Sequence, residues 1–278
     1  MKKLLKRLLS GTLFLAVVVG GLLLSEYTYL ILMAAVMLCC SVEIFRMLTV
    51  RKRFTAEKTC VFLAAFAFFV LAYACIRFGI EPKWLMLSFL PVLVAYLHML
   101  FDCGEDYQFK TSLYFPLLYV MLPLVSSLFL VFPAGGAYDP WILLSLLILI
   151  WSNDVGAYCL GMAFGQREHS KKLFPALSPK KSWIGVFGGT LLTFASAAAV
   201  AFTYGARYMK PCHWMAIAAI VATLGVCGDL FESLIKRHSQ VKDAGNIIPG
   251  HGGMLDRFDD VLFLIPATVI YLKLLSII

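Results

Sequence analysis

The sequence predicts an all-α integral membrane protein that crosses the bilayer several times. Hydrophobic residues make up 61% of the 278 residues and charged residues only 14%, and the mean hydropathy is +0.86. These values lie far outside the range of soluble proteins. Apolar runs of about 17–25 residues recur along the chain, each long enough to cross a hydrocarbon core of about 30 Å. We therefore predict a polytopic membrane protein with about nine transmembrane helices.

The expected spans follow one another with mostly short connections. We expect one membrane domain over residues 1–278, in which 1–140 carry the N-terminal and middle spans and 141–278 carry the C-terminal spans with two of the long loops. No internal repeat is visible, which weighs against many transporter folds. The expected spans are residues 8–24, 27–45, 60–79, 84–101, 112–132, 141–163, 184–204, 213–232 and 259–277.

The placement of basic residues predicts the orientation of these spans. With a cytoplasmic N-terminus, most of the 24 Lys and Arg residues fall on the cytoplasmic side, including those of the long loops 46–58, 164–183 and 233–258. This distribution satisfies the positive-inside rule. The opening MKKLLKR resembles the start of a secretory signal, but no small-residue cleavage site follows, so we expect an uncleaved first span. The net charge of +8 is then mostly a topology signal, and it does not indicate nucleic-acid binding.

Small residues inside the apolar runs are expected to serve packing. The eight cysteines are scattered and show neither a CxxC pair nor metal-ligand spacing. GMAFG (161–165) and GVFGG (185–189) carry glycines at the spacing of closely packed membrane helices. We expect helix–helix contact at both motifs.

The loop 164–183 ends in a cluster of hydroxyls and cations. Ser178-Pro179-Lys180-Lys181-Ser182 stands directly before a glycine-rich helix start. Free N–H groups and partial positive charge at a helix N-terminus suit phosphate. The alternative is a basic inner loop in which Ser182 only caps the helix.

Two acidic residues stand at the end of the run 213–232. Asp229, Glu232, Ser233 and Lys236 share one face if the helix continues. A carboxylate inside a span costs about 2.5–3.5 kcal/mol on insertion scales, so such residues usually face a polar interior and a partner. For Glu232 the simple interpretation is a pair with Lys236, whereas we expect Asp229, one turn deeper, to be functional.

Further carboxylates, Asp256, Asp259 and Asp260, begin the last expected span. Mg²⁺ takes oxygen ligands, often one or two carboxylates plus substrate phosphates. Asp229 and Asp256 on facing helices are suited to supply them. The PGHGG segment between them cannot form a regular helix, and its glycines allow the backbone to approach a phosphate. Together with the nearby cations, these residues predict Mg²⁺-dependent phosphate chemistry on an amphipathic substrate at the membrane surface.

The run from Ser233 to Asp259 resembles the signature of the phosphatidate cytidylyltransferases, also called CDP-diacylglycerol synthases. The family pattern has Ser, any residue, an aliphatic residue, Lys-Arg, four residues and Lys-Asp, followed by His-Gly-Gly and Asp-Arg-any-Asp. This chain reads S-LI-KR-HSQV-KD-AGNIIPG-HGG-ML-DRFD. The resemblance extends to NDVGAYCLGMAFG and LSPKKSWIGVFGG and is strong over about residues 150–270. One departure is Ile184, which stands where the family commonly has Glu, so the role of that Glu is absent or moved to a neighbour such as Glu232.

The resemblance implies a reaction of CTP with phosphatidate that gives CDP-diacylglycerol and pyrophosphate. It implies a multi-helix homodimer in the cell membrane, of the bacterial cytoplasmic type, with its site facing the cytoplasm and no nucleic-acid partner. Mg²⁺ is the implied cofactor, held by Asp229 and Asp256, and a second cation such as K⁺ is left open. The implied catalytic residues are Lys236, Arg237, Lys242, Arg257 and Asp259. The implied substrate-binding residues are Ser178, Lys180, Lys181, Ser182, Asn153, Asp154, His251, Gly252 and Gly253.

Other functions remain open on sequence alone. Another CTP-using membrane enzyme, such as a polyprenol kinase or an archaeal-lipid cytidylyltransferase, shares the type of site but not the full signature. A proton-coupled or anion transporter would also keep Asp and Lys in spans. A scaffold protein would tolerate loss of Asp256.

Overall fold

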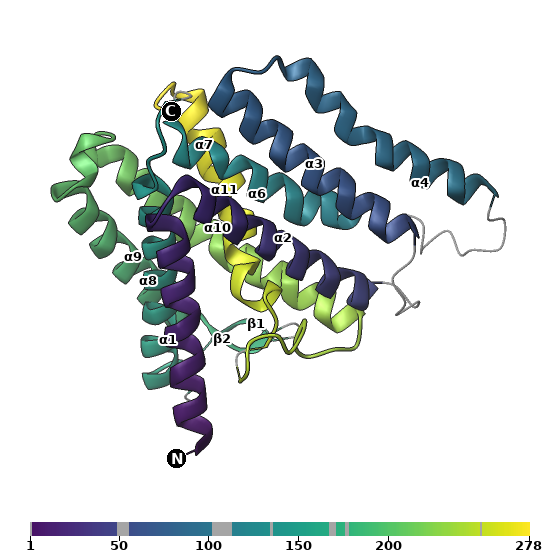
Figure 1. The fold of residues 1–278 in the computed structure, drawn as a ribbon. Coiled ribbons are helices and arrows are strands. Elements are labelled where there is room, and N and C mark those ends of the chain that lie inside the picture. Colours follow the sequence, from purple (N-terminus) through teal and green to yellow (C-terminus); the bar gives the residue numbers. More distant parts are fainter. Residues whose placement is uncertain are drawn as a thin grey trace. The chain divides into compact units, whose positions relative to one another are not determined.

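The computed structural model describes residues 2–48, 56–101, 113–133, 136–166, 171–175, 178–250 and 252–278. Within these ranges the regular structure is helical apart from one short hairpin, which confirms the predicted all-α class (Figure 1). The chain forms two compact units. Unit 1 comprises Met1–Tyr138 and Ser239–Phe258, and unit 2 comprises Asp139–His238 and Asp259–Ile278. The first division lies close to the expected one at 140, and the single membrane domain stays a prediction.

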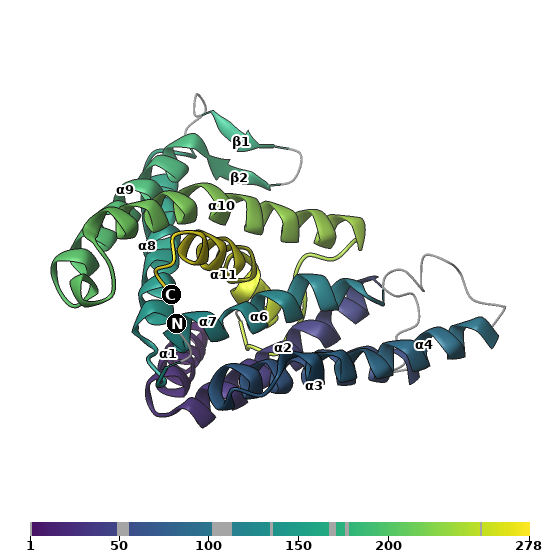
Figure 2. The ribbon, with the colours of Figure 1, turned by 90° about the horizontal axis from the view of Figure 1, so that it is seen from above.

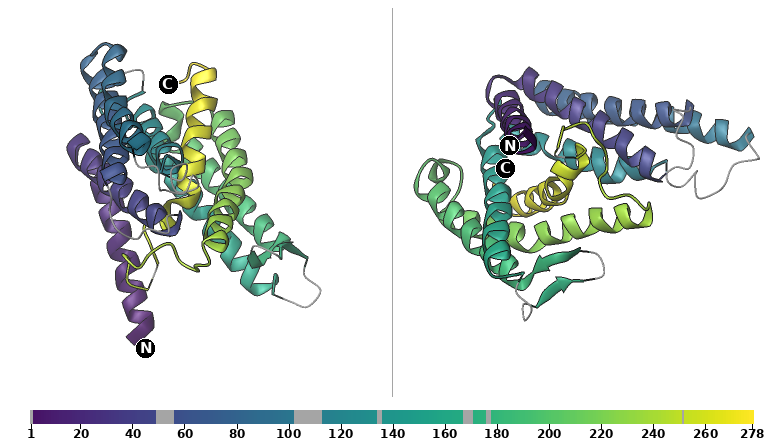
Figure 3. Two further views of the ribbon diagram at one scale, coloured as in Figure 1. Left: turned by 90° about the vertical axis from the view of Figure 1, so that its right-hand side faces the viewer. Right: turned by 90° about the horizontal axis from the view of Figure 1, so that it is seen from below.

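Unit 1 is built from long apolar helices and a loop. Its elements are α1 (Lys2–Leu23), α2 (Glu26–Leu48), α3 (Ala56–Phe78), a 3₁₀ segment η1 (Pro82–Phe89) leading into α4 (Leu90–Phe101), a π-helical turn η2 (Leu117–Met121), α6 (Leu122–Ser126) and α7 (Leu128–Val131). Helix α1 packs on α2, and α3 packs along η1 and α4, as Figure 1 shows. Residues 239–250 form an irregular loop, seen in Figure 3.

Unit 2 places a hairpin between two helices. Its elements are α8 (Trp141–Ala163), β1 (Lys172–Phe174), β2 (Ser178–Ser182), α9 (Trp183–Phe202), η4 (Gly205–Arg207), α10 (Pro211–His238) and the part of α11 (Leu255–Leu274) from Asp259 onward. The two strands pair antiparallel (Figure 2). Lys172 lies opposite Ser182 in this pairing. Helix α9 packs on both α8 and α10. The hairpin did not follow from the sequence, which indicated only a polar loop here.

Glycines bring α8 and α9 together. A Cβ atom on Gly156 would overlap the carbonyl oxygen of Gly188, and one on Gly188 would lie 2.6 Å from the carbonyl oxygen of Gly156. One turn along, a Cβ on Gly161 would meet the Cα of Gly185 at 3.7 Å. These contacts confirm the predicted packing of the two glycine motifs.

Five helices within the described residues are long and apolar enough to cross a membrane, namely α2, α3, α8, α9 and α10. Shorter apolar helices cover Leu8–Leu23, Pro82–Ala95 and Leu117–Val131. Helix α11 begins with a charged turn and contains Pro266. Each of the nine expected spans thus coincides with helix, and the multi-pass membrane class is confirmed. The number nine and the orientation stay predictions.

Candidate active site

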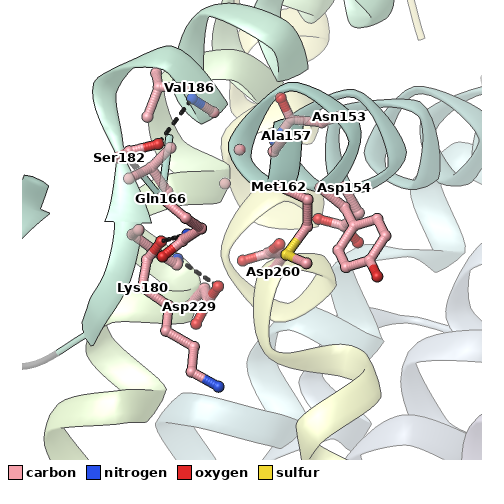
Figure 4. Close-up of a pocket in the computed structure, with 16 residues that line it drawn as sticks. Asn153, Asp154, Ala157, Met162, Gln166, Lys180, Ser182, Val186, Asp229 and Asp260 are labelled. Carbon is pink, nitrogen blue, oxygen red and sulfur yellow. Dashed lines mark hydrogen bonds and ion pairs between the residues drawn. The ribbon is translucent and has the colours of Figure 1, made fainter. Parts of the chain in front are cut away.

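Unit 2 contains a partly open cavity of about 610 Å³ (Figure 4). It is lined from α8, from β2 and the start of α9, from α10, and from α11. The wall is polar over one part and apolar over another. Its polar residues are Asn153, Asp154, Gln166, Lys180, Lys181, Ser182, Asp229 and Asp260, and its other residues are Ala157, Tyr158, Gly161, Met162, Gly185, Val186, Gly225 and Val226. An amphipathic ligand is the kind of molecule that such a wall suits.

An ion pair between Lys181 and Asp229 joins β2 to α10 across this cavity. The Asp229 side chain is 37% exposed, and its Oδ1 accepts a 3.5 Å hydrogen bond from the Ser233 hydroxyl. Successive residues of a strand point to opposite sides. Accordingly, the exposed Lys180 side chain extends away from Asp229 in Figure 4. Of the two lysines implicated in phosphate binding, Lys181 is the one paired with a carboxylate.

Asp260 presents a buried carboxylate to the same cavity. Its residue is 8% exposed, and its Oδ1 has no hydrogen-bond partner within the described part of the chain. Gly228 allows this placement because a Cβ there would lie 3.1 Å from Oδ1 of Asp260. An unpaired buried carboxylate oxygen is costly, so this atom is suited to receive a cation or a hydrogen-bond donor. The sequence marked Asp260 only as part of an acidic helix start.

Three other predicted residues line the cavity with different surroundings. Oδ1 of the buried Asn153 accepts a 3.4 Å hydrogen bond from the Thr193 hydroxyl. The Ser182 hydroxyl caps α9 by accepting a 3.2 Å hydrogen bond from the Gly185 amide, which confirms the predicted cap and leaves phosphate binding by this loop a prediction. Asp154 is exposed. A fourth predicted residue, the half-buried Ser178, begins β2 and is not among the residues that line the cavity. Direct substrate contact by any of them stays a prediction.

The end of α10 carries an internal ion pair. Glu232, which is 1% exposed, pairs with Lys236 one turn later, as the simpler interpretation of the sequence held. Arg237 is exposed in the last turn. Ile184, which replaces the family's usual Glu, is an exposed residue in the first turn of α9.

In unit 1, the signature loop folds around the Asp256 carboxylate. Oδ2 of Asp256 accepts hydrogen bonds from the amides of Ala244 at 3.0 Å and Gly253 at 2.7 Å. Gly252 has a φ of +85°, and its carbonyl accepts a 3.0 Å bond from the Ile248 amide. The Gly253 N–H is therefore directed at a carboxylate of the protein itself. His251 lies outside the described residues, and both Lys242 and Arg257 are exposed.

Glu43 of α2 was not anticipated. Its Oε1 accepts a 3.0 Å hydrogen bond from the Met254 amide and its Oε2 a 2.8 Å bond from the Leu255 amide. The residue is fully buried. A glutamate inside the apolar run 27–45 is a signal that could have drawn attention to it. No spacing in the sequence connects position 43 with positions 254 and 255.

The predicted metal ligands belong to different units, Asp229 to the cavity of unit 2 and Asp256 to the loop of unit 1. Within the ranges that the structure describes, no three His, Cys, Asp or Glu side chains are grouped as a metal site. Asp259, the third acidic residue of the predicted site, belongs to unit 2, where its backbone oxygen lies beside Gly228. The metal assignment stays a prediction.

Sequence comparisons agree with the resemblance of the signature loop. A profile described as the cytidylyltransferase family matches residues 5–275. The chain belongs to the cytidylyltransferase family. Among its relatives, the phosphatidate cytidylyltransferase of Bacillus subtilis is 43% identical over 130 residues, which are 46% of each chain. That of Thermotoga maritima is 35% identical over 195 residues, which are 68% of this chain and 70% of the relative.

The matches to relatives are partial in length. A third relative, the phosphatidate cytidylyltransferase of Pseudomonas aeruginosa, is 38% identical over 45% of both chains. The chain thus spans about half the length of several curated relatives that it matches. Membership of the family is established over nearly the whole chain, since the profile covers residues 5–275.

Proposed function

We propose that this protein is a CTP:phosphatidate cytidylyltransferase, which makes CDP-diacylglycerol and pyrophosphate for phospholipid synthesis. The observation that carries the proposal is the cavity of unit 2, where Lys181, Asp229 and Asp260 belong to the polar part of the wall and the other part is apolar. A multi-pass membrane protein of the cytidylyltransferase family needs such a site if one substrate is a lipid with a phosphate headgroup.

The reaction requires little proton chemistry. A phosphate monoester has a second pKa of about 6 and is largely ionised at neutral pH, so its oxygen attacks without a general base. An oxygen–phosphorus bond forms at the α-phosphorus of CTP, and the bond to the oxygen bridging to the β-phosphorus breaks. Pyrophosphate leaves with that bonding pair. The difficult part is to bring two anions together, which cationic side chains and metal ions accomplish.

Lys181 is placed to begin this task. In the free protein its charge is neutralised by Asp229. A substrate phosphate that enters the cavity competes for the Lys181 ammonium and frees the Asp229 carboxylate. Lys236, Arg237, Lys242 and Arg257 are the further cations that the signature assigns to phosphates. Of these, Lys236 forms an ion pair with Glu232 in the free protein.

The acidic residues fit the proposed Mg²⁺. Hard cations prefer carboxylate oxygens, and the cavity wall offers the half-exposed Asp229 together with the unpaired oxygen of Asp260. Asp229 would hold the ion, with Asp256 as the second ligand assigned by the signature and Asp259 in support. Bound Mg²⁺ would neutralise phosphate charge and stabilise the departing pyrophosphate. A second cation such as K⁺ is left open.

We also propose the cellular setting of the enzyme. The charge distribution favours a multi-pass protein of the cell membrane whose long loops face the cytoplasm, where CTP is available. The apolar wall with Met162 and Val186 suits the first carbons of the acyl chains. The partners are CTP, phosphatidate and the lipid bilayer, and the family resemblance adds a homodimer.

The test is pyrophosphate release by the purified protein in detergent with CTP, phosphatidate and Mg²⁺, together with omission of each component in turn. We expect release only with all three, accompanied by a CMP-bearing lipid. In a parallel reaction with a lipid alcohol in place of phosphatidate, formation of its phosphate together with CDP would instead indicate a kinase. Absence of release from folded protein would overturn the proposal and direct attention to Ile184.

A further inference from the structure

A buried carboxylate from a distant helix holds the start of α11. Glu43 lies in the fifth turn of α2, and its two oxygens accept hydrogen bonds from the amides of Met254 and Leu255, at 3.0 and 2.8 Å. These two residues are separated from Glu43 by more than 200 positions. All the groups involved belong to unit 1.

The site around Glu43 is built for this carboxylate. Leu255 is the first residue of α11, whose N-terminal amides have no partner within the helix and attract negative charge. A Cβ on Gly245 would overlap Oε1 of Glu43, and a Cβ on Gly253 would lie 2.6 Å from both oxygens. The two glycines of the signature loop therefore leave the space that the carboxylate occupies.

The same loop also holds Asp256. The Gly253 amide donates to Asp256 and the next two amides donate to Glu43, so three consecutive N–H groups serve two carboxylates. A second amide on Asp256 comes from Ala244, beside Gly245. Release of Glu43 would free the segment 253–255 and with it the hydrogen bond that the Gly253 amide donates to Asp256.

We propose that Glu43 is a positioning residue for the reaction, acting by fixing the signature loop and the Asp256 carboxylate. This inference rests on the proposed function, in which Asp256 is a ligand of Mg²⁺. Both oxygens of Glu43 are already engaged with amides, so it is not assigned contact with substrate. Its effect on turnover passes through Asp256.

The first test compares Glu43→Gln with the wild type by hydrogen–deuterium exchange of the segment 253–258. A Gln amide offers one acceptor oxygen and turns an NH₂ group toward the other backbone amide. Loss of a charge-assisted hydrogen bond at this position is expected to speed exchange of the Met254 and Leu255 amides by about tenfold or more. Glu26→Gln is the matched control, because Glu26 lies at the other end of α2 and pairs with Arg77.

The second test measures turnover by the same folded proteins. We expect Glu43→Gln to lower kcat by about tenfold and to raise the Mg²⁺ concentration for the half-maximal rate, with a smaller change in KM for CTP. Glu43→Asp keeps the charge and should recover part of the rate. A residue that only stabilises the fold would lower the unfolding temperature without moving the Mg²⁺ response.

A variant of the loop tests the same contact from its other side. Gly245→Ala introduces a methyl group against Oε1 of Glu43 and should reproduce the faster exchange and the shifted Mg²⁺ response. Gly20→Ala is its control, since a Cβ on Gly20 meets nothing within 4 Å. If Glu43→Gln does not fold, the exchange and the Mg²⁺ response of Gly245→Ala and Glu43→Asp test whether Glu43 fixes the loop.

The outcomes separate this proposal from the proposed function. If hydrogen–deuterium exchange of the segment 253–258 is unchanged in Glu43→Gln and Gly245→Ala, Glu43 does not fix the loop and the proposal is overturned. Faster exchange with wild-type kcat and Mg²⁺ response would overturn the positioning role and leave a purely structural anchor. A folded wild type that releases no pyrophosphate would overturn the function and the catalytic part of the proposal, while the exchange data would still decide whether Glu43 holds the loop.

Discussion

At the scale of single residues, Asp229 is the carboxylate on which the proposed chemistry depends most. It is the cavity residue that pairs with Lys181, and it is exposed enough to bind a cation. We expect Asp229→Asn to lower pyrophosphate release by about a hundredfold or more, because charge stabilisation of the reacting phosphates is lost. The protein should still insert and fold, which size-exclusion chromatography and thermal unfolding would check.

A matched carboxylate outside the site controls for this substitution. Glu81 is an exposed residue next to η1 that pairs with Lys83, so Glu81→Gln should leave turnover unchanged. Asp256→Asn should be nearly as inactive as Asp229→Asn if both hold Mg²⁺. Normal turnover in either aspartate variant would remove that aspartate from the metal assignment.

The buried oxygen of Asp260 leads to a different expectation. A neutral amide of the same size costs less to bury than an unpaired carboxylate, so Asp260→Asn should match or exceed the wild type in unfolding temperature. Turnover should fall by about tenfold or more, since a charged group is lost from the cavity wall. Thermal unfolding and pyrophosphate release measured on one preparation test both parts. A less stable protein with full turnover would show that Asp260 is structural.

At the scale of elements, strand β2 separates the roles of two adjacent lysines. Lys181 pairs with Asp229, whereas Lys180 is exposed and extends away from it (Figure 4). Lys181→Ala should therefore raise KM and lower kcat/KM by about tenfold or more, and Lys180→Ala should have a clearly smaller effect. Steady-state kinetics with CTP and phosphatidate varied in turn would measure both. Equal losses in the two variants would contradict the distinction.

The crossing of α8 and α9 gives a second prediction at this scale. Gly156→Ala forces a methyl group against the Gly188 carbonyl and should destabilise the protein by about 1–3 kcal/mol. Gly161→Ala in the same helix places its methyl at an ordinary contact distance of 3.7 Å. That control should be neutral or stabilising by about 0.5–1 kcal/mol, because Ala favours a helix interior. Unfolding in detergent compares the two, and equal stability would contradict the close crossing.

Whether a feature could be predicted from the sequence depends on how far apart along the chain the interacting residues lie. The spans, the glycine contacts and the Glu232–Lys236 pair depend on composition and on neighbours one helical turn away, which a single chain displays directly. The β1–β2 hairpin depends on the register of two short segments. The distinction between Lys180 and Lys181 follows from that register. The contact of Glu43 with Met254 joins residues 211 positions apart, so only the folded chain reveals it.

At the scale of the whole molecule, one contiguous signature serves two compact units. Ser233 to His238 belong to unit 2, Ser239 to Phe258 to unit 1, and Asp259 with Asp260 again to unit 2. The signature, which reads as one loop in the sequence, therefore supplies the Asp256 cradle of unit 1 and leads directly into Asp260, a cavity carboxylate of unit 2.

The orientation of the chain in the membrane provides the last prediction. The positive-inside distribution places Ser239 of the signature loop on the cytoplasmic side and Glu81, before η1, on the opposite side. In a background without the native cysteines, an impermeant maleimide applied to intact cells should label Glu81→Cys and not Ser239→Cys. Permeabilised cells should show labelling of both. The reverse pattern would place the signature loop, and the nucleotide site proposed for it, on the side of the membrane where CTP is absent.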